Sequence, residues 1–296
     1  MKSNLLLLLT AVIWGFAFVA QRAGMEYIGP FAFNAIRFAL GSVSLIPLLI
    51  INRSRNNQSA NLFHFKNKYF IKGGLILGVV LFLGSTLQQT GLVYTSAGKS
   101  GFITGLYIIL VPIFGLFIGQ KTSLFTWLGA MTAVIGLYLL SVTEDLSMNI
   151  GDILVLTSAV FWAVQILIIG FLSTRTDAIQ LAFYHFVICS FLSFIASLIT
   201  EVTTLSRILE ALIPILYAGI CSVGIAYTLQ IIAQRKAHPA NAAIIMSLEA
   251  VFAVIGGWLI LSESIPLRGL IGCAFMLAGM ILSQINFEKK TEIRSS

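Results

Sequence analysis

The stretch Thr95–Gly115, TSAGKSGFITGLYIILVPIFG, joins a turn of small residues to an apolar run that contains a tyrosine and a proline. Small residues let helix backbones approach closely in a bilayer, and a proline within a span is tolerated there because neighbouring groups satisfy the freed carbonyl. We therefore interpret this stretch as a membrane helix. A second copy of the pattern follows at 238–258, about 143 residues later.

The composition predicts the same class of protein. The chain has 296 residues, of which 58% are hydrophobic and 10% are charged, and its mean hydropathy is +0.97. A soluble domain carries about 25% charged residues, so we expect an all-α integral membrane protein. Cys189, Cys221 and Cys273 lie singly in apolar runs, which predicts neither a disulfide framework nor a metal site.

About 20 apolar residues cross the hydrocarbon core of a bilayer, and ten stretches of the sequence reach this length. The expected spans are 4–21, 30–51, 70–92, 98–118, 124–142, 152–172, 178–199, 211–233, 240–261 and 267–287. The first of them superficially resembles a signal peptide. Its apolar run continues without a convincing cleavage site, so we interpret it as a membrane helix.

Lys and Arg residues predict the orientation, because they concentrate in cytoplasmic loops. With the N-terminus inside, the cytoplasmic set is Lys2, Arg53, Arg55, Lys66, Lys68, Lys72, Lys121, Arg175, Arg235, Lys236, Lys289, Lys290 and Arg294. The outer set is Arg22, Lys99, Arg207 and Arg268, and Arg37 lies within a span. Both termini are therefore expected in the cytoplasm. The net charge of +7 then has a topological role, and no nucleic-acid partner is expected.

The two halves of the chain repeat one another. The matching segments are AVIWGFAFV (11–19) with AVFWAVQIL (159–167), TLQ (86–88) with TLQ (228–230), and WLGAMTAVIG (127–136) with GLIGCAFMLAG (269–279). Each half holds five expected spans, an odd number, so the two copies cross the membrane in opposite directions. Such inverted repeats are typical of secondary transporters, which hold substrate near the midplane between the repeats.

The segments TSAGKSGFITGLYIILVP, WGFAFVAQRAG and LEAVFAVIGGWLILSESI (248–265) resemble the EamA domains of the drug/metabolite transporter superfamily. The resemblance covers two tandem domains, 4–142 and 152–287, followed by a cytoplasmic tail at 288–296. It implies ten transmembrane helices, a bacterial inner-membrane location and transport of small metabolites or drugs. The chain departs from the family pattern at Ala250, where such domains often have proline, which puts hinge behaviour there in doubt.

Glu249 is the strongest candidate for a functional side chain. At 1.5 Å per residue it lies about 13 Å into its span, near the middle of a core that is about 30 Å thick. A charged group at that depth costs about 2.5–3.5 kcal/mol, so the carboxyl is expected either to take up protons or cations in a cavity or to bond to a neighbouring helix. Both interpretations stay open on the sequence alone.

Four further residues form the expected wall of a substrate site. Tyr107 lies at nearly the depth of Glu249 in the companion span, and Trp14 and Trp162 are both about ten residues into their spans. Mid-span tryptophans are not explained as interfacial anchors. They either face lipid or pack in the core, or they form an aromatic wall that stacks a substrate or holds a cation. Gln165, one turn after Trp162, adds a donor and an acceptor.

Arg37 and His185 are equivalent under an offset of 148 residues and are included among the substrate-binding candidates, although each also has a structural interpretation. Gln88 and Gln230, the repeated TLQ glutamines, are expected near opposite ends of their spans, as gates or as helix-end caps. Lys99 is expected to anchor its span at the outer interface.

Enzyme signatures are missing from the sequence, which contains no HExxH, GxSxG or P-loop motif. We expect no enzyme activity and no cofactor. The expected partners are a small-molecule substrate, protons or another coupling ion, and the lipid bilayer, with the chain acting as a monomer or homodimer. Export is the favoured direction; import by the same fold, a membrane-embedded enzyme and a non-transporting sensor are the alternatives.

Overall fold

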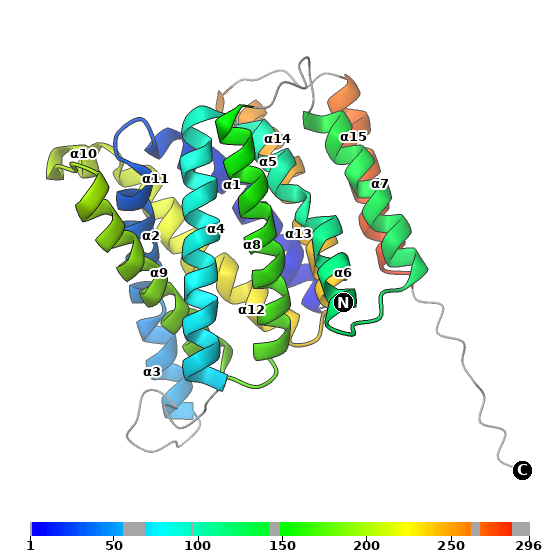
Figure 1. The fold of residues 1–296 in the computed structure, drawn as a ribbon, viewed down its shortest axis with the longest axis horizontal. Helices are drawn as coiled ribbons and strands as arrows, with labels where there is room; N and C mark the ends of the chain where they lie inside the picture. Colours follow the sequence, from blue (N-terminus) through cyan, green and yellow to red (C-terminus); the bar gives the residue numbers. More distant parts are fainter. Residues whose placement is uncertain (1, 56–68, 96, 142–148, 262–266, 286–296) are drawn as a thin grey trace, which may run out of the picture.

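A computed structural model of the chain describes residues 2–55, 69–95, 97–141, 149–261 and 267–285. Across these ranges the protein is helical and contains no β-strand, as Figure 1 shows. The α-helices in chain order are α1 Lys2–Gly24, α2 Pro30–Ser44, α3 Ile46–Arg55, α4 Gly74–Tyr94, α5 Ala97–Gly105, α6 Tyr107–Phe117, α7 Leu124–Ser141, α8 Ile150–Leu172, α9 Ala178–Thr200, α10 Leu205–Glu210, α11 Leu212–Leu216, α12 Thr228–Gln234, α13 Pro239–Met246, α14 Glu249–Leu261 and α15 Leu267–Ser283. Two π-helical stretches, η1 Tyr69–Gly73 and η2 Tyr217–Tyr227, precede α4 and α12.

Eight runs of helix are long and apolar enough to cross a membrane, which makes this a membrane-protein fold. They are Lys2–Gly24, Pro30–Asn52, Tyr69–Tyr94, Lys99–Phe117, Ile150–Leu172, Ala178–Thr200, Leu212–Gln234 and Pro239–Ile260. Each coincides with an expected span. The two other expected spans are apolar helices that are shorter, Leu124–Leu140 and Leu267–Ser283. At 1.5 Å per residue they reach about 25 Å, so ten membrane crossings stay a prediction.

Large apolar side chains are exposed on the outside of this bundle, and polar side chains are buried within its mostly apolar core. Large apolar residues such as Leu198 and Ile199 are 69% and 77% exposed on the outside of the bundle, while Asn34 and Gln89 are fully buried inside it. An apolar exterior suits a lipid solvent, and buried polar groups in a bilayer protein mark sites with a role in packing or function.

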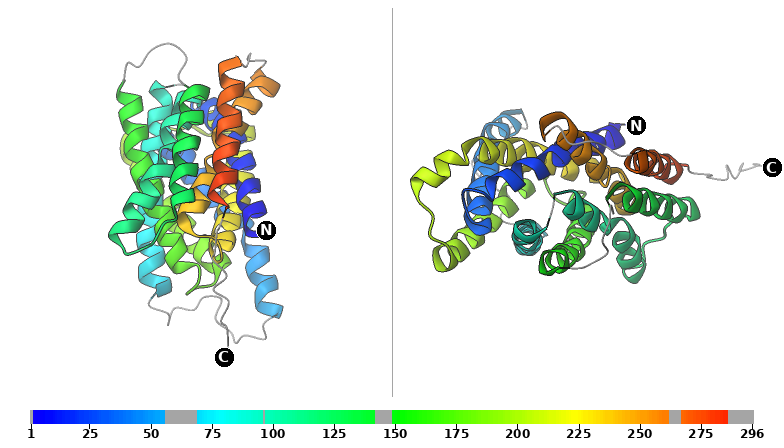
Figure 2. Two further views of the ribbon diagram at one scale, coloured as in Figure 1. Left: turned by 90° about the vertical axis from the view of Figure 1, so that its right-hand side faces the viewer. Right: turned by 90° about the horizontal axis from the view of Figure 1, so that it is seen from above.

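Glycines bring α7 and α15 into backbone contact at one edge of the bundle, where Figures 1 and 2 show the two helices side by side. A Cβ added to Gly129 would lie 2.6 Å from the Gly279 carbonyl oxygen, and one added to Gly136 would lie 2.5 Å from that of Gly272. The reverse distances, from Gly279 and Gly272, are 2.5 and 2.6 Å. These four positions leave no room for a side chain, which is the packing expected between membrane helices.

Two glutamines tie neighbouring helices together in the same way in each half. Gln89 Nε2 donates to the Gln21 carbonyl oxygen at 3.3 Å, and Gln234 Nε2 donates to that of Ile166 at 2.9 Å. Each bond spans 68 residues of sequence. The donor and the acceptor of the second bond both lie 145 residues after those of the first.

Candidate functional site

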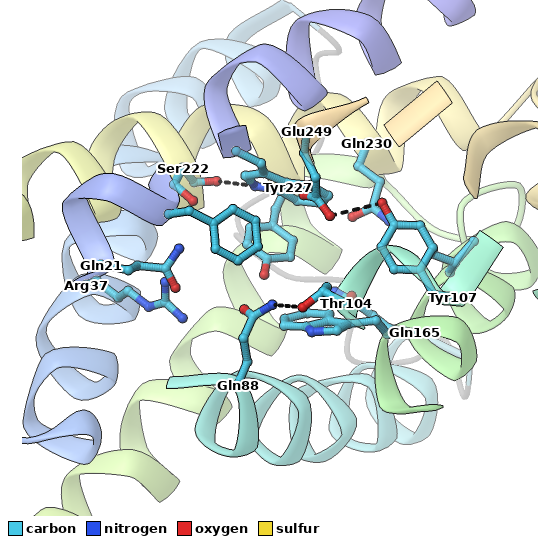
Figure 3. A pocket seen from close by; sticks show the side chains of 14 residues that line it. Gln21, Arg37, Gln88, Thr104, Tyr107, Gln165, Ser222, Tyr227, Gln230 and Glu249 are labelled. Carbon is cyan, nitrogen blue, oxygen red and sulfur yellow. Dashed lines mark hydrogen bonds between the residues drawn. The ribbon is translucent and has the colours of Figure 1, made fainter. Parts of the chain in front are cut away.

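A cavity lies inside the bundle, and both halves of the chain contribute to its wall. The space that the centre of a water-sized molecule can reach is about 40 Å³. Its lining residues are Trp14, Phe18, Gln21, Arg37, Gln88, Thr104, Tyr107, Trp162, Gln165, Ile166, Ser222, Tyr227, Gln230 and Glu249. Figure 3 shows their side chains converging from several helices.

Two interrupted helices carry the residues at one end of this cavity. α5 and α6 are separated at Leu106, whose N–H bonds to the Ile103 carbonyl at 3.2 Å, and α13 and α14 are separated at Ser247 and Leu248. The Leu248 N–H bonds to the Ile245 carbonyl, also at 3.2 Å. These bonds reach back three residues instead of four, a tightening that often marks a functional hinge.

Each interruption places one polar side chain at the start of the next helix. Tyr107 is the first residue of α6, and Glu249 is the first residue of α14. Tyr107 Oη donates to Glu249 Oε1 at 3.1 Å, and the two residues are 3% and 4% exposed. In the described part of the chain no basic group lies within 4.0 Å of this carboxyl. The hydrogen bond therefore joins the halves at the cavity and leaves the carboxyl without a charged partner.

Aromatic rings form the middle of the cavity around Tyr227. The Trp14 ring lies 4.7 Å from the Tyr227 ring in an edge-to-face arrangement, and the Trp162 ring lies 6.2 Å from it. Trp14 Nε1 donates to the Ser222 carbonyl oxygen at 3.3 Å. That carbonyl belongs to η2, where π-helical geometry is common at functional sites. The rings provide apolar and π surface suited to stacking a substrate.

Arg37 and Gln21 lie together at the opposite end of the cavity from Tyr107 in Figure 3. Arg37 is 2% exposed, and its guanidinium carbon lies 4.9 Å from the centroid of the Phe38 ring and 5.7 Å from that of Phe33. This end is cationic, whereas the Glu249 end carries a carboxyl.

The predicted gates, Gln88 and Gln230, both line this one cavity, although the sequence placed them near opposite ends of their spans. Gln88 Nε2 donates to Thr104 Oγ1 at 2.9 Å, which fixes α4 to α5. Gln165, which the sequence predicted as a binding residue, also lines the cavity, as does Trp162 one turn earlier on α8. Gating by the two glutamines stays a prediction.

His185 lies outside the cavity wall, unlike the other predicted binding residues. It is fully buried, its Nδ1 is 2.6 Å from the Leu181 carbonyl oxygen, and its ring lies 4.4 Å from that of Phe186. α4 covers this part of α9, because a Cβ on Gly78 would lie 3.2 Å from the His185 carbonyl oxygen. Its equivalence with Arg37 in sequence therefore does not extend to the site.

Lys99, expected at an interface, lies against the start of α8. Its Nζ is 2.6 Å from Asp152 Oδ2, and Thr95 Oγ1 donates to Asp152 Oδ1 at 2.7 Å. The Asn149 N–H also donates to Asp152 Oδ2, at 2.8 Å, within a capping box. This cluster joins the end of α4 and the start of α5 to α8, away from the cavity lining.

The sequence did not single out several residues of the wall. They are Phe18, Gln21, Thr104, Ile166, Ser222 and Tyr227. Helical spacing offered a signal for two of them, because Gln21 lies two turns after Trp14 and Thr104 lies one turn before Tyr107. Tyr227 lies within a π-helical stretch, which hydrophobic periodicity does not distinguish from an α-helix. Among the described residues, no group of three or more His, Cys, Asp or Glu side chains is placed to hold a metal ion.

Comparison with known proteins assigns the family. Residues 1–142 and 149–284 each match the EamA-like transporter family. The chain belongs to the EamA-like transporter family. An "uncharacterized transporter" of Archaeoglobus fulgidus is 30% identical over 95% of this chain and 85% of its own length. The "uncharacterized transporter YoaV" of Bacillus subtilis is 22% identical over 94% of this chain and 95% of its own.

A solved crystal structure has the same fold, with a TM-score of 0.79 and 16% sequence identity over 96% of both chains. At that identity the similarity concerns the fold alone. The family, the names of these relatives and the apolar helices together indicate a multi-pass membrane transporter rather than an enzyme.

Proposed function

We propose that this EamA-family protein is a secondary transporter that moves small zwitterionic or amphipathic metabolites, such as amino acids, by alternating access. The observation that carries the proposal is the buried Tyr107–Glu249 hydrogen bond, which joins the two halves where both of their helices are interrupted. The site lies between Trp14, Tyr107, Trp162 and Gln165, as transporters place it between repeats. Arg37 contributes a cation.

Pairs of equivalent contacts support an inverted repeat of five helices per half, with domains at 4–142 and 152–287. The sequence aligns Gly129 with Gly272 and Gly136 with Gly279. A two-fold axis in the membrane plane then converts the contact between Gly129 and Gly279 into the contact between Gly272 and Gly136, and both contacts occur. The repeated glutamine bonds fit the same operation. We place the protein in a bacterial inner membrane with both termini in the cytoplasm.

The size of the cavity bears on the mechanism. Ligand sites in proteins usually measure about 300–1,000 Å³, whereas this cavity offers water-sized access to about 40 Å³. The free space is therefore smaller than a metabolite needs, and binding one requires the side chains and helices around the cavity to move apart. The tightened turns at Leu106 and Leu248 are suited to that movement because they already lack regular α-helical bonding.

Glu249 supplies the coupling step in this proposal. When it is ionised, the carboxylate accepts the Tyr107 hydrogen bond in a cavity where no basic group of the described chain neutralises it. Protonation removes the charge and lowers the free-energy cost of moving the carboxyl through apolar surroundings when the protein changes orientation. Proton occupancy then biases the equilibrium between the two orientations, and an outward flux coupled to proton entry results in export. Import by the same fold is the alternative.

Flux measurements with purified protein in liposomes test the proposal. The panel consists of radiolabelled apolar amino acids, amines and neutral metabolites, with and without an imposed pH gradient. We expect Glu249→Gln to keep exchange of substrate but to lose acceleration by the gradient. Tyr107→Phe, altered at the other end of the same hydrogen bond, should transport more slowly but keep its response to the gradient. Wild-type protein that moves no member of the panel would contradict the transporter assignment, and an unchanged gradient response in Glu249→Gln would exclude the coupling role.

A further inference from the structure

Arg37 is a buried cation without a protein anion to balance it. Within the described ranges no carboxylate lies within 4.0 Å of its guanidinium, and its Nε has no hydrogen-bond partner. The rings of Phe33 and Phe38 flank the group, but a cation–π contact supplies no acceptor for its N–H groups. Burying an arginine in this state costs several kcal/mol, and buried charges in proteins are normally paired.

The groups next to Arg37 extend the same pattern. Asn34, one turn earlier on α2, is fully buried, and neither its Nδ2 nor its Oδ1 has a partner. Gln21 reaches the cavity next to Arg37 (Figure 3), and its Oε1 is also without a partner. A buried arginine that lines an internal cavity and has unused donors fits a ligand that brings its own acceptors.

The chemistry of the ligand follows from the guanidinium. Its N–H groups form a planar fork that matches the two oxygens of a carboxylate. Tyr227, Trp14 and Trp162 form the wall between Arg37 and the Glu249 end. A ligand anchored at Arg37 therefore lays its remaining atoms along aromatic rings.

We infer that the substrate of this cavity carries a carboxylate that Arg37 binds, attached to an apolar body that packs against Trp14, Tyr227 and Trp162. The inference rests on the proposed function and narrows it. Apolar amino acids and apolar monocarboxylic acids belong to the substrate class, and organic cations without a carboxylate do not. Gln21 lines the carboxylate end of the cavity together with Arg37.

A set of four probes separates the carboxylate from the amine. They are leucine, 4-methylpentanoate, leucinamide and 3-methylbutylamine, which share one apolar body and differ in the two polar groups. Binding is measured by quenching of intrinsic tryptophan fluorescence, and flux is measured in liposomes. We expect leucine and 4-methylpentanoate to bind at least about 10-fold more tightly than the other two, because hydrogen bonds between charged groups in a buried site are worth about a 10- to 100-fold change in affinity.

Variants assign this preference to Arg37. Arg37→Gln should lower carboxylate affinity by about 10- to 100-fold and remove the preference over leucinamide, whereas Arg268→Gln, exposed and outside the cavity lining, should change neither. Asn34→Asp provides a second variant that does not depend on removing the arginine. Its carboxylate, three residues before Arg37 on one helix face, should pair with the guanidinium, raise the melting temperature and displace the probes' carboxylates.

Each outcome bears on one of the two proposals. Equal binding of all four probes, preference for 3-methylbutylamine, or an unchanged preference in Arg37→Gln would overturn the assignment of Arg37. Flux of amines but not of carboxylates would overturn it as well and leave the transporter assignment intact. Absence of flux for every compound, with carboxylate binding that depends on Arg37, would overturn transport while supporting the carboxylate site.

Discussion

The interrupted helices α5–α6 and α13–α14 share one tightened backbone turn and carry different side chains after it. At Leu106 and at Leu248 the N–H bonds to the carbonyl three residues earlier, at 3.2 Å in both cases, and the four residues involved are related by an offset of 142. The next residue is Tyr107 in the first half and Glu249 in the second. The backbone turn is therefore duplicated between the halves, whereas the polar side chain that follows it is not.

The duplicated part continues away from the cavity. The α7–α15 contact uses two glycines from each half, and the glutamine bonds use one donor from each half. By contrast, Arg37 reaches the cavity and its counterpart His185 does not. Two-fold equivalence therefore describes the scaffold, whereas the cavity combines a cation from one half with a carboxyl from the other.

Breaking the duplicated scaffold at α7 and α15 should have the largest effect. We expect Gly136→Ala and Gly279→Ala each to destabilise the protein by about 1–3 kcal/mol, because the added Cβ would lie 2.5 Å from a backbone carbonyl oxygen on the partner helix. The two changes should have similar effects, and together they should prevent recovery of folded protein. Thermal unfolding and size-exclusion chromatography in detergent measure both outcomes.

Gly101→Ala is the matched control for that experiment. No atom lies within 4 Å of the position of its added Cβ, and alanine has the higher helix propensity by about 1 kcal/mol. We expect unchanged or slightly raised stability. If Gly136→Ala has the same melting temperature as the wild type, the helices move apart at little cost. The glycine contact between α7 and α15 would then not stabilise the fold.

Exchanging Tyr107 and Glu249 tests whether flux depends only on having a phenol–carboxyl pair or also on which half carries each group. Tyr107→Glu alone puts two carboxyls in contact, which then share one proton, and Glu249→Tyr alone removes the carboxyl. We expect each single change to lower flux at least about 10-fold, or about 1.4 kcal/mol. The double variant restores one phenol and one carboxyl across the interface and should recover to within about threefold of wild type. If the double variant is as slow as the slower single variant, then transport requires the carboxyl at the first position of α14 and not only a phenol–carboxyl pair.

The sequence was sufficient to predict the helical membrane fold and to place Tyr107 and Glu249 at one depth, because depth follows from counting residues along a span. It was insufficient for the hydrogen bond between them, which depends on how two helices rotate. It grouped His185 with Arg37, because an offset fixes position along a helix but not which neighbour covers it; α4 covers His185 at Gly78. It also missed Tyr227, since apolar periodicity does not report the π-helical turns of η2.

The smallest expected effect compares the two glutamine bonds. Gln89→Met and Gln234→Met keep the length of the side chain and leave the Gln21 and Ile166 carbonyls without these donors. Each change should cost about 0.5–1.5 kcal/mol, and the costs should add because distant sites behave independently. Gln120→Met, outside both bonds, should leave the melting temperature unchanged. If the two variants lose unequal amounts of unfolding free energy, the halves share a hydrogen-bond pattern but not its energy. The surroundings of one bond, such as lipid, the cavity or the π-helical stretch, would then stabilise it more than the other.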